Sequence, residues 1–230
     1  MESVNIFSSA EKDYSVGDPA IGSYVRQLLC PLDDKIRDVL RDMASLGDLP
    51  NLQIAVTDAR HLEVLSALKR AKNAVEIGTL FGFSAYFITR GMASDGRLIT
   101  IEKDPRFGSI AEENFVKLGI ADRIDQRIGA AEDVLSEIEE TGPFDFVFID
   151  ANKSSYPMYL KWAARNLQPG GVLVADNTFA WGHLLDSTPP AEIAVEIQAI
   201  RTFNYVLGRS PQFLTTILPT AEGLTVAVKR

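Results

Sequence analysis

The sequence predicts an α/β fold built on a mostly parallel, seven-stranded sheet with helices on both faces. Near-continuous apolar runs such as Val172–Ala175 and Phe144–Ile149, in which five of six residues are apolar, are typical of strands buried on both faces of a parallel sheet. Helix-length segments separate most of the strand-like runs, as a parallel crossover requires. The last two runs, 213–218 and 224–228, are too close together for a crossover, so they must form an antiparallel hairpin with one reversed strand.

Length and composition limit the classes of protein that fit. A chain of 230 residues with 46% apolar and 23% charged residues can form one α/β domain with a substantial core. The net charge of −8 argues against a nucleic-acid partner, since proteins that bind phosphate backbones are usually basic. Cys30 has no second cysteine to pair with, and there is neither a membrane-spanning run nor a secretory signal. We therefore expect a cytoplasmic protein without membrane or nucleic-acid partners.

The N-terminal part, residues 1–50, is predicted to precede a sheet domain over 51–230 in a protein of one domain overall. Residues up to about 20 are polar and aperiodic, which is typical of a loose arm. Two helices should follow, and the clearer one begins near Pro31 and stops at Gly47. Its apolar stripe is formed by Leu32, Ile36, Leu40 and Met43.

A further helix is expected before the first strand. Thr57 or Asp58 suits its N-terminal cap, because short polar side chains accept hydrogen bonds from free backbone amides. The leucines predicted to face the core are Leu62, Leu65 and Leu68.

The elements of the sheet domain follow in order. Asp104 and Pro105 should start a helix that ends before Gly119. Residues 124–128 alternate between apolar and polar, which indicates a strand at the sheet edge. The predicted strands are 74–77, 97–102, 124–128, 144–149, 171–175, 213–218 and 224–228.

Three more helices are predicted between these strands. One runs from about Ala131 to Glu139, and one ends at Gln168–Gly171. Pro189–Pro190 opens a long helix that buries Ile193, Ile197, Ile200 and Phe203.

Polar side chains follow two of the buried strands. Asp150 comes directly after 144–149, and Asp176 and Asn177 come directly after 171–175. Ligands bind outside the carboxyl ends of strands in open α/β sheets. If the two strands are neighbours, these oxygens converge, and such hard ligands select Mg²⁺, Ca²⁺ or Mn²⁺. The alternative is that each aspartate caps the following helix.

Lys153 lies three residues after Asp150. Beside a dication its pKa should fall, which would make it a general base, although a lysine is more often a surface residue. Trp181 and Tyr156 could form walls for a flat aromatic substrate, but core packing is the commoner role. His61 and His183 fit packing or surface positions better than ligand positions.

The turn after the first strand contains Gly78 and Gly82, which would let the backbone approach a ligand closely. Their spacing is not that of a dinucleotide-binding fingerprint. Glu102 ends the second strand, where an acidic residue can bind ribose hydroxyls. A tight turn and a solvated strand end are the alternatives.

These motifs together resemble the cation-dependent class I S-adenosylmethionine O-methyltransferases, the family of catechol and caffeoyl-CoA O-methyltransferases. The matching segments are Val75–Gly78, Gly82–Ser84, Ile101–Glu102, Phe148–Asp150 with Lys153, and Ala175–Asn177. The resemblance runs from about Asn51 to the C-terminus and implies a Rossmann-like methyltransferase sheet.

The resemblance also implies roles for individual residues. S-adenosylmethionine would contact Glu76, Gly78, Ser84, Glu102 (at its ribose), Ala131 (near its adenine) and Asp150. The metal ligands would be Asp150, Asp176 and Asn177, with Mg²⁺, Ca²⁺ or Mn²⁺ as the ion. Lys153 would be the general base, and Asp150 and Asn177 would complete the catalytic group.

Two segments depart from the family pattern. Asn152 stands where many relatives have a second aspartate, and Thr57–Arg60 departs from the common version of this segment, which contains small residues and glycine. Residues 1–50 match weakly, and in this family such segments shape the substrate pocket and a homodimer interface.

The expected function is therefore cation-dependent O-methylation of a vicinal-diol small molecule by S-adenosylmethionine. The alternatives are a metal-independent methyltransferase on the same fold, an NAD-dependent oxidoreductase, and a catalytically silent binding protein. The glycine spacing and the terminal hairpin disfavour the oxidoreductase. Catechols, hydroxycinnamoyl thioesters, flavonoids and natural-product diols all fit as acceptors.

Overall fold

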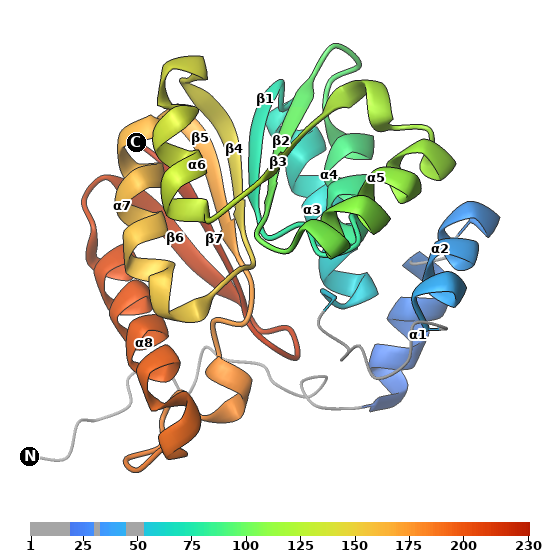
Figure 1. The fold of residues 1–230 in the computed structure, drawn as a ribbon. Coiled ribbons are helices and arrows are strands. Elements are labelled where there is room, and N and C mark those ends of the chain that lie inside the picture. The colour runs from blue at the N-terminus through green and yellow to red at the C-terminus, as the bar shows by residue number, and fades with distance from the viewer. Residues whose placement is uncertain (1–18, 30–32, 45–52) are drawn as a thin grey trace, which may run out of the picture.

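The computed structural model describes residues 19–29, 33–44 and 53–230 and confirms the predicted α/β sheet (Figure 1). Its seven strands lie in the order β3-β2-β1-β4-β5-β7-β6. Strand β7 is antiparallel to β5 and β6, and the other pairs are parallel. The strands are β1 (Asn73–Ile77), β2 (Arg97–Glu102), β3 (Ile124–Ile128), β4 (Phe144–Ile149), β5 (Leu167–Ala175), β6 (Phe213–Leu218) and β7 (Leu224–Lys229).

The helices lie on both faces of this sheet, with α3, α4 and α5 on one side and α6, α7 and α8 on the other (Figure 1). The α-helices are α1 (Pro19–Leu29), α2 (Asp34–Ala44), α3 (Val56–Lys69), α4 (Phe83–Gly91), α5 (Pro105–Leu118), α6 (Ala131–Glu137), α7 (Tyr156–Asn166) and α8 (Ala194–Arg209). Short 3₁₀ helices are η1 (Ala121–Arg123), η2 (Glu139–Thr141), η3 (Lys153–Ser155), η4 (Ala180–Gly182) and η5 (Ala191–Ile193).

Strand β4 is buried on both faces, as its apolar run predicts. Phe146 and Phe148 pack into the core layer under α3 and α4, and Val147 and Ile149 pack into the layer under α7 and α8. Burying one such side chain stabilises the fold by roughly 1.5–3 kcal/mol. A shift of one residue would exchange the two sets between faces, so these side chains specify the register. Strand β3 is at the edge, as predicted.

Helix α2 begins later than predicted. Asp33 accepts a hydrogen bond from the backbone N–H of Ile36 at 3.0 Å, so a carboxylate provides the cap instead of a proline opening the first turn. Ile36 is buried, as predicted. Pro31, Leu32, Gly47 and the N-terminal arm over 1–18 lie outside the described residues.

The predictions for α3 are partly wrong. Ala55 is the N-cap residue and makes no side-chain capping bond, while Asp58 is buried. Leu62 is fully buried and Leu65 is partly buried, but Leu68 is 76% exposed. Six residues after Leu62, a helix has rotated by about 240° from the inner face, which places Leu68 towards solvent.

Two element boundaries also differ from the prediction. Helix α7 ends at Asn166, and Gln168–Gly171 belong to β5, because β5 already pairs with β4 at Leu167. Helix α8 starts at Ala194, after η5, and buries Ile197, Ile200 and Phe203 as predicted, with Ile193 partly buried.

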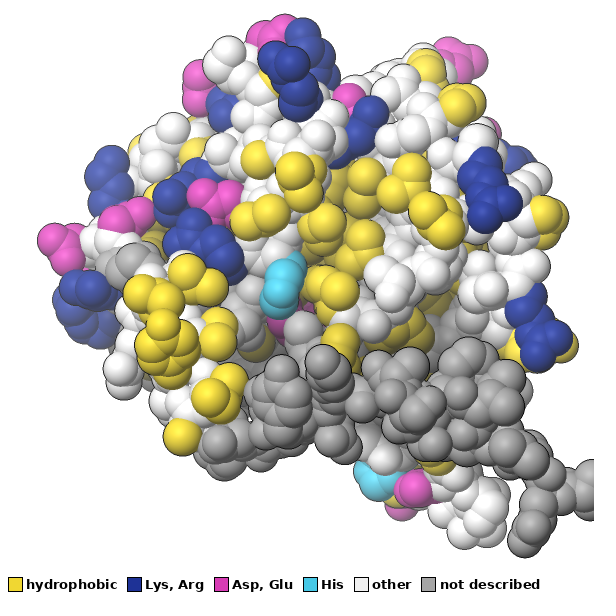
Figure 2. All heavy atoms as spheres, turned by 180° about the vertical axis from the view of Figure 1, so that it is seen from behind, with side chains coloured by type: hydrophobic (Ala, Val, Ile, Leu, Met, Phe, Trp, Pro, Cys, Tyr) yellow, Lys and Arg dark blue, Asp and Glu magenta, His cyan; other side chains and the backbone are white. Residues whose placement is uncertain are grey.

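One side of the terminal hairpin remains exposed. Leu214 of β6 and Val228 of β7 are paired neighbours and are 63% and 37% exposed. Seen from behind, hydrophobic side chains gather in the middle of the molecule's surface (Figure 2). Among the described helices, none has the length and apolar character that crossing a membrane requires.

Candidate active site

The carboxyl ends of the central strands open on a cavity of about 570 Å³. This is the edge where open α/β sheets bind ligands. The predicted site residues that line it are Gly78, Ser84, Glu102, Ala131, Asp150, Lys153 and Asn177. The structure therefore brings most of the predicted residues to one cavity, although they come from separate parts of the chain.

Glu102 is held in a defined orientation at the end of β2. Its Oε2 accepts a hydrogen bond from the backbone N–H of Leu80 at 2.8 Å, and its Oε1 accepts one from Asp104 at 2.9 Å. Each carboxylate oxygen can accept further bonds, so the group can still bind a pair of hydroxyls. This geometry suits the predicted contact with a ribose.

The turn after β1 requires its glycines. Gly78 has φ +102°, and a Cβ there would lie 2.1 Å from the backbone oxygen of Asp150. Gly82 has φ +82°, and a Cβ there would lie 2.4 Å from the ring of Phe115. Close packing between β1 and β4 therefore explains Gly78, and the same contact places its backbone beside Asp150.

Glu76 lies beneath the cavity and is not among its lining residues. It is fully buried, and its Oε2 accepts a hydrogen bond from the Thr100 hydroxyl at 2.6 Å. Burial raises the pKa of Glu76 to about 8, although hydrogen bonds from Ser84 and Thr100 act in the opposite direction and lower it. Its predicted contact with the cofactor stays a prediction.

The raised pKa of Glu76 makes stability depend on pH. The unfolded carboxyl loses its proton near pH 4.5, and the folded one keeps it to about 8. Its stabilising contribution is therefore complete below the unfolded pKa and is lost as pH rises through the folded pKa. We expect the melting temperature of the ligand-free protein to fall by roughly 5 °C or more between about pH 6 and about pH 8.5.

Thermal unfolding followed by circular dichroism checks this expectation. Glu76→Gln should remove a large part of the fall, while the exposed Glu140→Gln should melt with the pH dependence of the wild type. An unchanged slope in Glu76→Gln would contradict the assignment.

Asp150, Asp176 and Asn177 directly follow the neighbouring strands β4 and β5, and of the three Asp150 and Asn177 line the cavity while Asp176 does not. Ile149 pairs with Ala175, and the Asp176 N–H donates to the Ile149 carbonyl at 3.1 Å. The two strands are thus adjacent and parallel, as the prediction required.

Tyr156 supports this strand edge from inside the core. It is fully buried, and its hydroxyl lies 3.0 Å from the Asp176 carbonyl and 3.3 Å from the Ile149 carbonyl. It therefore belongs to the core and does not form a substrate wall. Trp181, by contrast, lines the cavity and is 43% exposed.

The donor set at this edge fits a hard cation. Asp176 is 2% exposed, and its Oδ1 has no hydrogen-bond partner. Burial and then the charge of Asp150 raise the pKa of Asp176 to about 8. An unpaired buried carboxylate is unfavourable, and a cation would relieve this.

The described residues contain no group of three or more His, Cys, Asp or Glu that could hold a metal. Asp150, Asp176 and Asn177 are two carboxylates and one amide, and binding of a cation by this set stays a prediction.

Lys153 reaches the same place from η3. Its Nζ lies 2.6 Å from Asp150 Oδ1 and 5.1 Å from the centroid of the Tyr156 ring, and its side chain is 11% exposed. Burial lowers the pKa of Lys153, but Tyr156 and Asp150 more than offset burial and raise it above its usual value. The charge of a bound dication would act in the opposite direction, which is the condition for the predicted general base.

Sequence reasoning missed Glu222, which lines the cavity from the turn between β6 and β7 and contacts Asn177. It also missed Asp58, which is 1% exposed and whose charge reaches Asp176 and Glu222. Neither residue comes directly after a strand, so no local pattern marks it. His61 and His183 are not among the lining residues.

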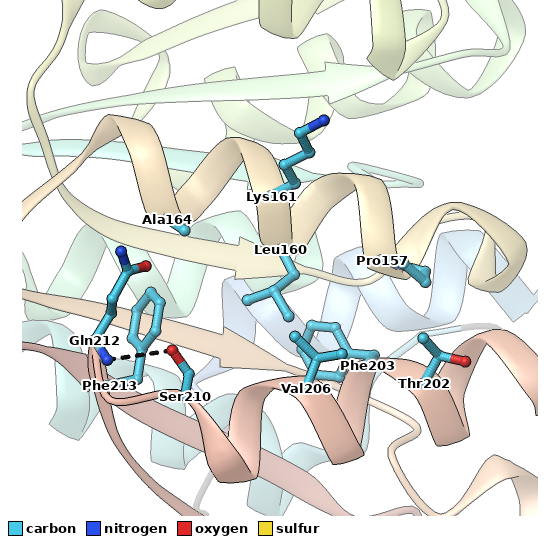
Figure 3. Close-up of a pocket in the computed structure, with 10 residues that line it drawn as sticks. All are labelled: Pro157, Leu160, Lys161, Ala164, Thr202, Phe203, Val206, Ser210, Gln212 and Phe213. Atoms are coloured by element: carbon cyan, nitrogen blue, oxygen red, sulfur yellow. Dashed lines mark hydrogen bonds between the residues drawn. The ribbon is translucent and has the colours of Figure 1, made fainter.

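A second cavity, of about 250 Å³, lies between α7, α8 and the start of β6 (Figure 3). Leu160, Phe203 and Val206 form its apolar wall, and its polar contact is a hydrogen bond from the Gln212 N–H to Ser210 Oγ at 3.2 Å. It lacks a cluster of reactive groups, so the larger cavity is the candidate site.

Comparison with known proteins finds relatives that match most of this chain. A family model described as O-methyltransferase matches residues 31–230. A catechol O-methyltransferase from Niastella koreensis is 36% identical over 218 residues, covering 91% of this chain and 96% of the relative. One from Mycobacterium tuberculosis is 30% identical over 223 residues, covering 95% and 99%.

Solved structures share the fold over nearly the whole chain. The O-methyltransferase from Bacillus cereus in complex with SAH has a TM-score of 0.85 and 34% identity, covering 92% of this chain and 97% of that one. A Streptomyces achromogenes O-methyltransferase involved in tomaymycin synthesis, in complex with SAM, has a TM-score of 0.83 and 31% identity, covering 91% and 96%. The chain therefore belongs to the O-methyltransferase family.

Proposed function

We propose that this enzyme transfers the methyl group of S-adenosylmethionine to one hydroxyl of a vicinal diol, in a reaction that depends on a divalent cation. The observation that carries the proposal is the Lys153–Asp150 pair in the cavity that also contains Glu102. At the end of the neighbouring strand, Asp176 has a buried oxygen without a hydrogen-bond partner. Relatives named catechol O-methyltransferase support the diol, and neighbours in complex with SAH or SAM support the donor.

The donor would occupy the part of the cavity over β1 and β2. Glu102 would bind its ribose hydroxyls, and Gly78 and Ser84 would border the rest of it from the turn into α4. Ala131, at the start of α6, would lie near the adenine. Glu76 would act from below through Ser84 and Thr100.

Asp150, Asp176 and Asn177 would hold the cation, with Mg²⁺ as the ion that best suits two carboxylates and an amide oxygen. When bound, this ion supplies a Lewis acid that lowers the pKa of the acceptor hydroxyl.

Lys153 would take the proton from the acceptor. A phenol has a pKa of about 10, so its hydroxyl needs a nearby base at neutral pH. The phenolic oxygen then forms a bond to the methyl carbon, the carbon–sulfur bond breaks towards sulfur, and the proton stays on Lys153 Nζ. Trp181 would hold the acceptor ring, and such orientation contributes up to about 7–11 kcal/mol in favourable cases.

The charges around the cavity favour a neutral or cationic acceptor. Among the described residues that line the cavity, Lys103 and Lys153 are the basic ones. The other ionisable residues there are acidic, apart from Tyr159, which is normally neutral. The acidic ones are Glu102, Glu132, Asp150, Glu196 and Glu222. A thioester of coenzyme A carries several phosphate charges that these carboxylates would repel, so we propose a small diol as the acceptor.

A product assay tests the proposal. The full chain is incubated with S-adenosylmethionine, with either Mg²⁺ or excess chelator, and with catechol, dopamine, caffeate or caffeoyl-CoA. Mass spectrometry should detect monomethylated catechol and dopamine only with Mg²⁺, and caffeoyl-CoA should be the poorest acceptor. Equal turnover in chelator would favour a metal-independent methyltransferase, and a preference for the thioester would contradict the acceptor class.

For the assembly we propose a homodimer. The exposed pair Leu214 and Val228 offers an apolar surface for such contact. Sedimentation velocity of the full chain measures the assembly state.

A further inference from the structure

Glu222 contacts the proposed cation site from a distant part of the sequence. It lies in the exposed turn between β6 and β7 and lines the cavity. Its Oε2 accepts a hydrogen bond from the side-chain Nδ2 of Asn177, which is 7% exposed. An exposed carboxylate at the mouth of the cavity thus holds a buried amide.

The backbone places Glu222 at this position. The N–H of Thr178 donates to the Gly223 carbonyl at 3.0 Å, and the N–H of Phe179 donates to the Glu222 carbonyl at 2.9 Å. Gly223 has φ +77°, and a Cβ there would lie 2.7 Å from the ring of Phe179. The turn is therefore packed directly against the loop that carries Asn177.

The chemistry of the two groups determines which side of the Asn177 amide faces Glu222. A carboxylate only accepts hydrogen bonds, whereas an asparagine side chain has an NH₂ donor on one side and a carbonyl acceptor on the other. With its NH₂ group on Glu222, Asn177 directs its carbonyl oxygen elsewhere. No hydrogen bond within the described chain uses that oxygen. The carbonyl is also the part of the amide that can bind a hard cation.

We propose that Glu222 is a positioning residue that fixes the Asn177 amide with its carbonyl oxygen available to the cation held by Asp150 and Asp176. The inference rests on the proposed cation site and gives Glu222 no ligand role. The Asn177 backbone has φ +55°, outside regular strand geometry, so no regular element orients this side chain.

Partners that orient metal ligands typically contribute 10–100-fold in metal affinity. Because Glu222 is exposed, we expect an effect of about tenfold, at the low end of that range.

The first test measures Mn²⁺ affinity by the electron paramagnetic resonance of the free ion. Glu222→Ala should weaken binding about tenfold. Glu222→Gln should stay within about threefold of the wild type, since its amide oxygen still accepts from Asn177 although the charge is gone. The exposed Glu192→Ala, outside the cavity, is the control. Equal losses in the Ala and Gln variants would overturn positioning in favour of charge or direct ligation.

A double-variant comparison sharpens the distinction. Asn177→Asp offers two equivalent oxygens, so its orientation no longer matters. In that background Glu222→Ala should not weaken Mn²⁺ binding, and removal of the repulsion between two carboxylates should strengthen it. A repeated tenfold loss would overturn the proposal.

The second readout needs no metal. In the ¹⁵N spectrum of the metal-free protein, the Asn177 side-chain amide is identified by its disappearance in Asn177→Asp. One of its protons should be shifted downfield and protected from exchange in the wild type and in Glu222→Gln, and unshifted in Glu222→Ala. If the wild type binds no Mn²⁺, the proposed cation site is wrong. The amide spectrum then decides by itself whether Glu222 orients Asn177, and an unchanged amide in Glu222→Ala would show that it does not.

Discussion

Replacing Lys153 with methionine is expected to lower kcat by about 10²–10⁴-fold, the usual contribution of a positioned general base. Methionine preserves much of the length of the buried side chain and removes the amine. The Nζ of Lys153 lies 2.6 Å from Asp150 in the cavity, so its removal affects the site where the acceptor would lose its proton. Binding of S-adenosylhomocysteine, measured by calorimetry, should change by less than about threefold, because the donor is expected over β1 and β2.

Lys153→Arg distinguishes the effect of the positive charge of Lys153 from its proposed role as a general base. A guanidinium keeps the positive charge next to Asp150 but is not deprotonated in proteins. We therefore expect a loss of kcat similar to that of Lys153→Met. Lys161→Met, on the exposed side of α7, is the matched control and should retain wild-type kcat. Near-normal kcat in Lys153→Arg would show that the positive charge matters and that proton transfer occurs elsewhere.

Asp150→Asn is expected to abolish the stimulation of turnover by Mg²⁺ and to lower kcat by more than about 100-fold. Each factor of ten in kcat corresponds to about 1.36 kcal/mol of lost transition-state stabilisation. The change removes one of the two proposed carboxylate ligands and keeps the size of the side chain. It also removes one of the two groups that raise the pKa of Lys153, and Tyr156 remains as the other. The variant should therefore retain the lysine and lose the cation.

Manganese titration and donor titration together check this result. Mn²⁺ affinity should fall in parallel with kcat, while affinity for S-adenosylhomocysteine should fall by less than about tenfold. Asp133→Asn, on the exposed surface of α6, is the control. Full activity of Asp150→Asn in excess chelator would end the cation hypothesis.

Local sequence was sufficient where neighbouring residues decide the structure. The start and end of α5 follow from Asp104, Pro105 and Gly119, and the structure confirms all three roles. The continuous burial of β4 follows from its apolar run. Both are short-range effects: a cap bonds to an amide a few residues away, and a strand that is apolar at nearly every position must be covered on both faces.

Longer-range packing accounts for the failures. Leu68 is apolar but lies on the outer side of α3, since the rotation of the helix, rather than residue type, decides which positions meet the sheet. Helix α7 gives way to β5 at Leu167 because strand pairing with Phe144 outweighs the turn signals at Pro169 and Gly170. For Tyr156 the commoner role, core packing, is confirmed, while Trp181 lines the cavity instead.

The succession of seven strands and the presence of Asp150, Asp176 and Asn177 after buried strands follow from the amino-acid order alone, because periodicity and strand ends are properties of contiguous residues. The contacts of Lys153 with Asp150 and of Glu222 with Asn177, 45 residues away in sequence, arise only when the chain is folded. The contact between Glu222 and Asn177 depends on how the terminal hairpin pairs with β5 and on where the turn of the hairpin packs against the loop after β5. No local sequence pattern encodes this contact between residues that are far apart in the chain.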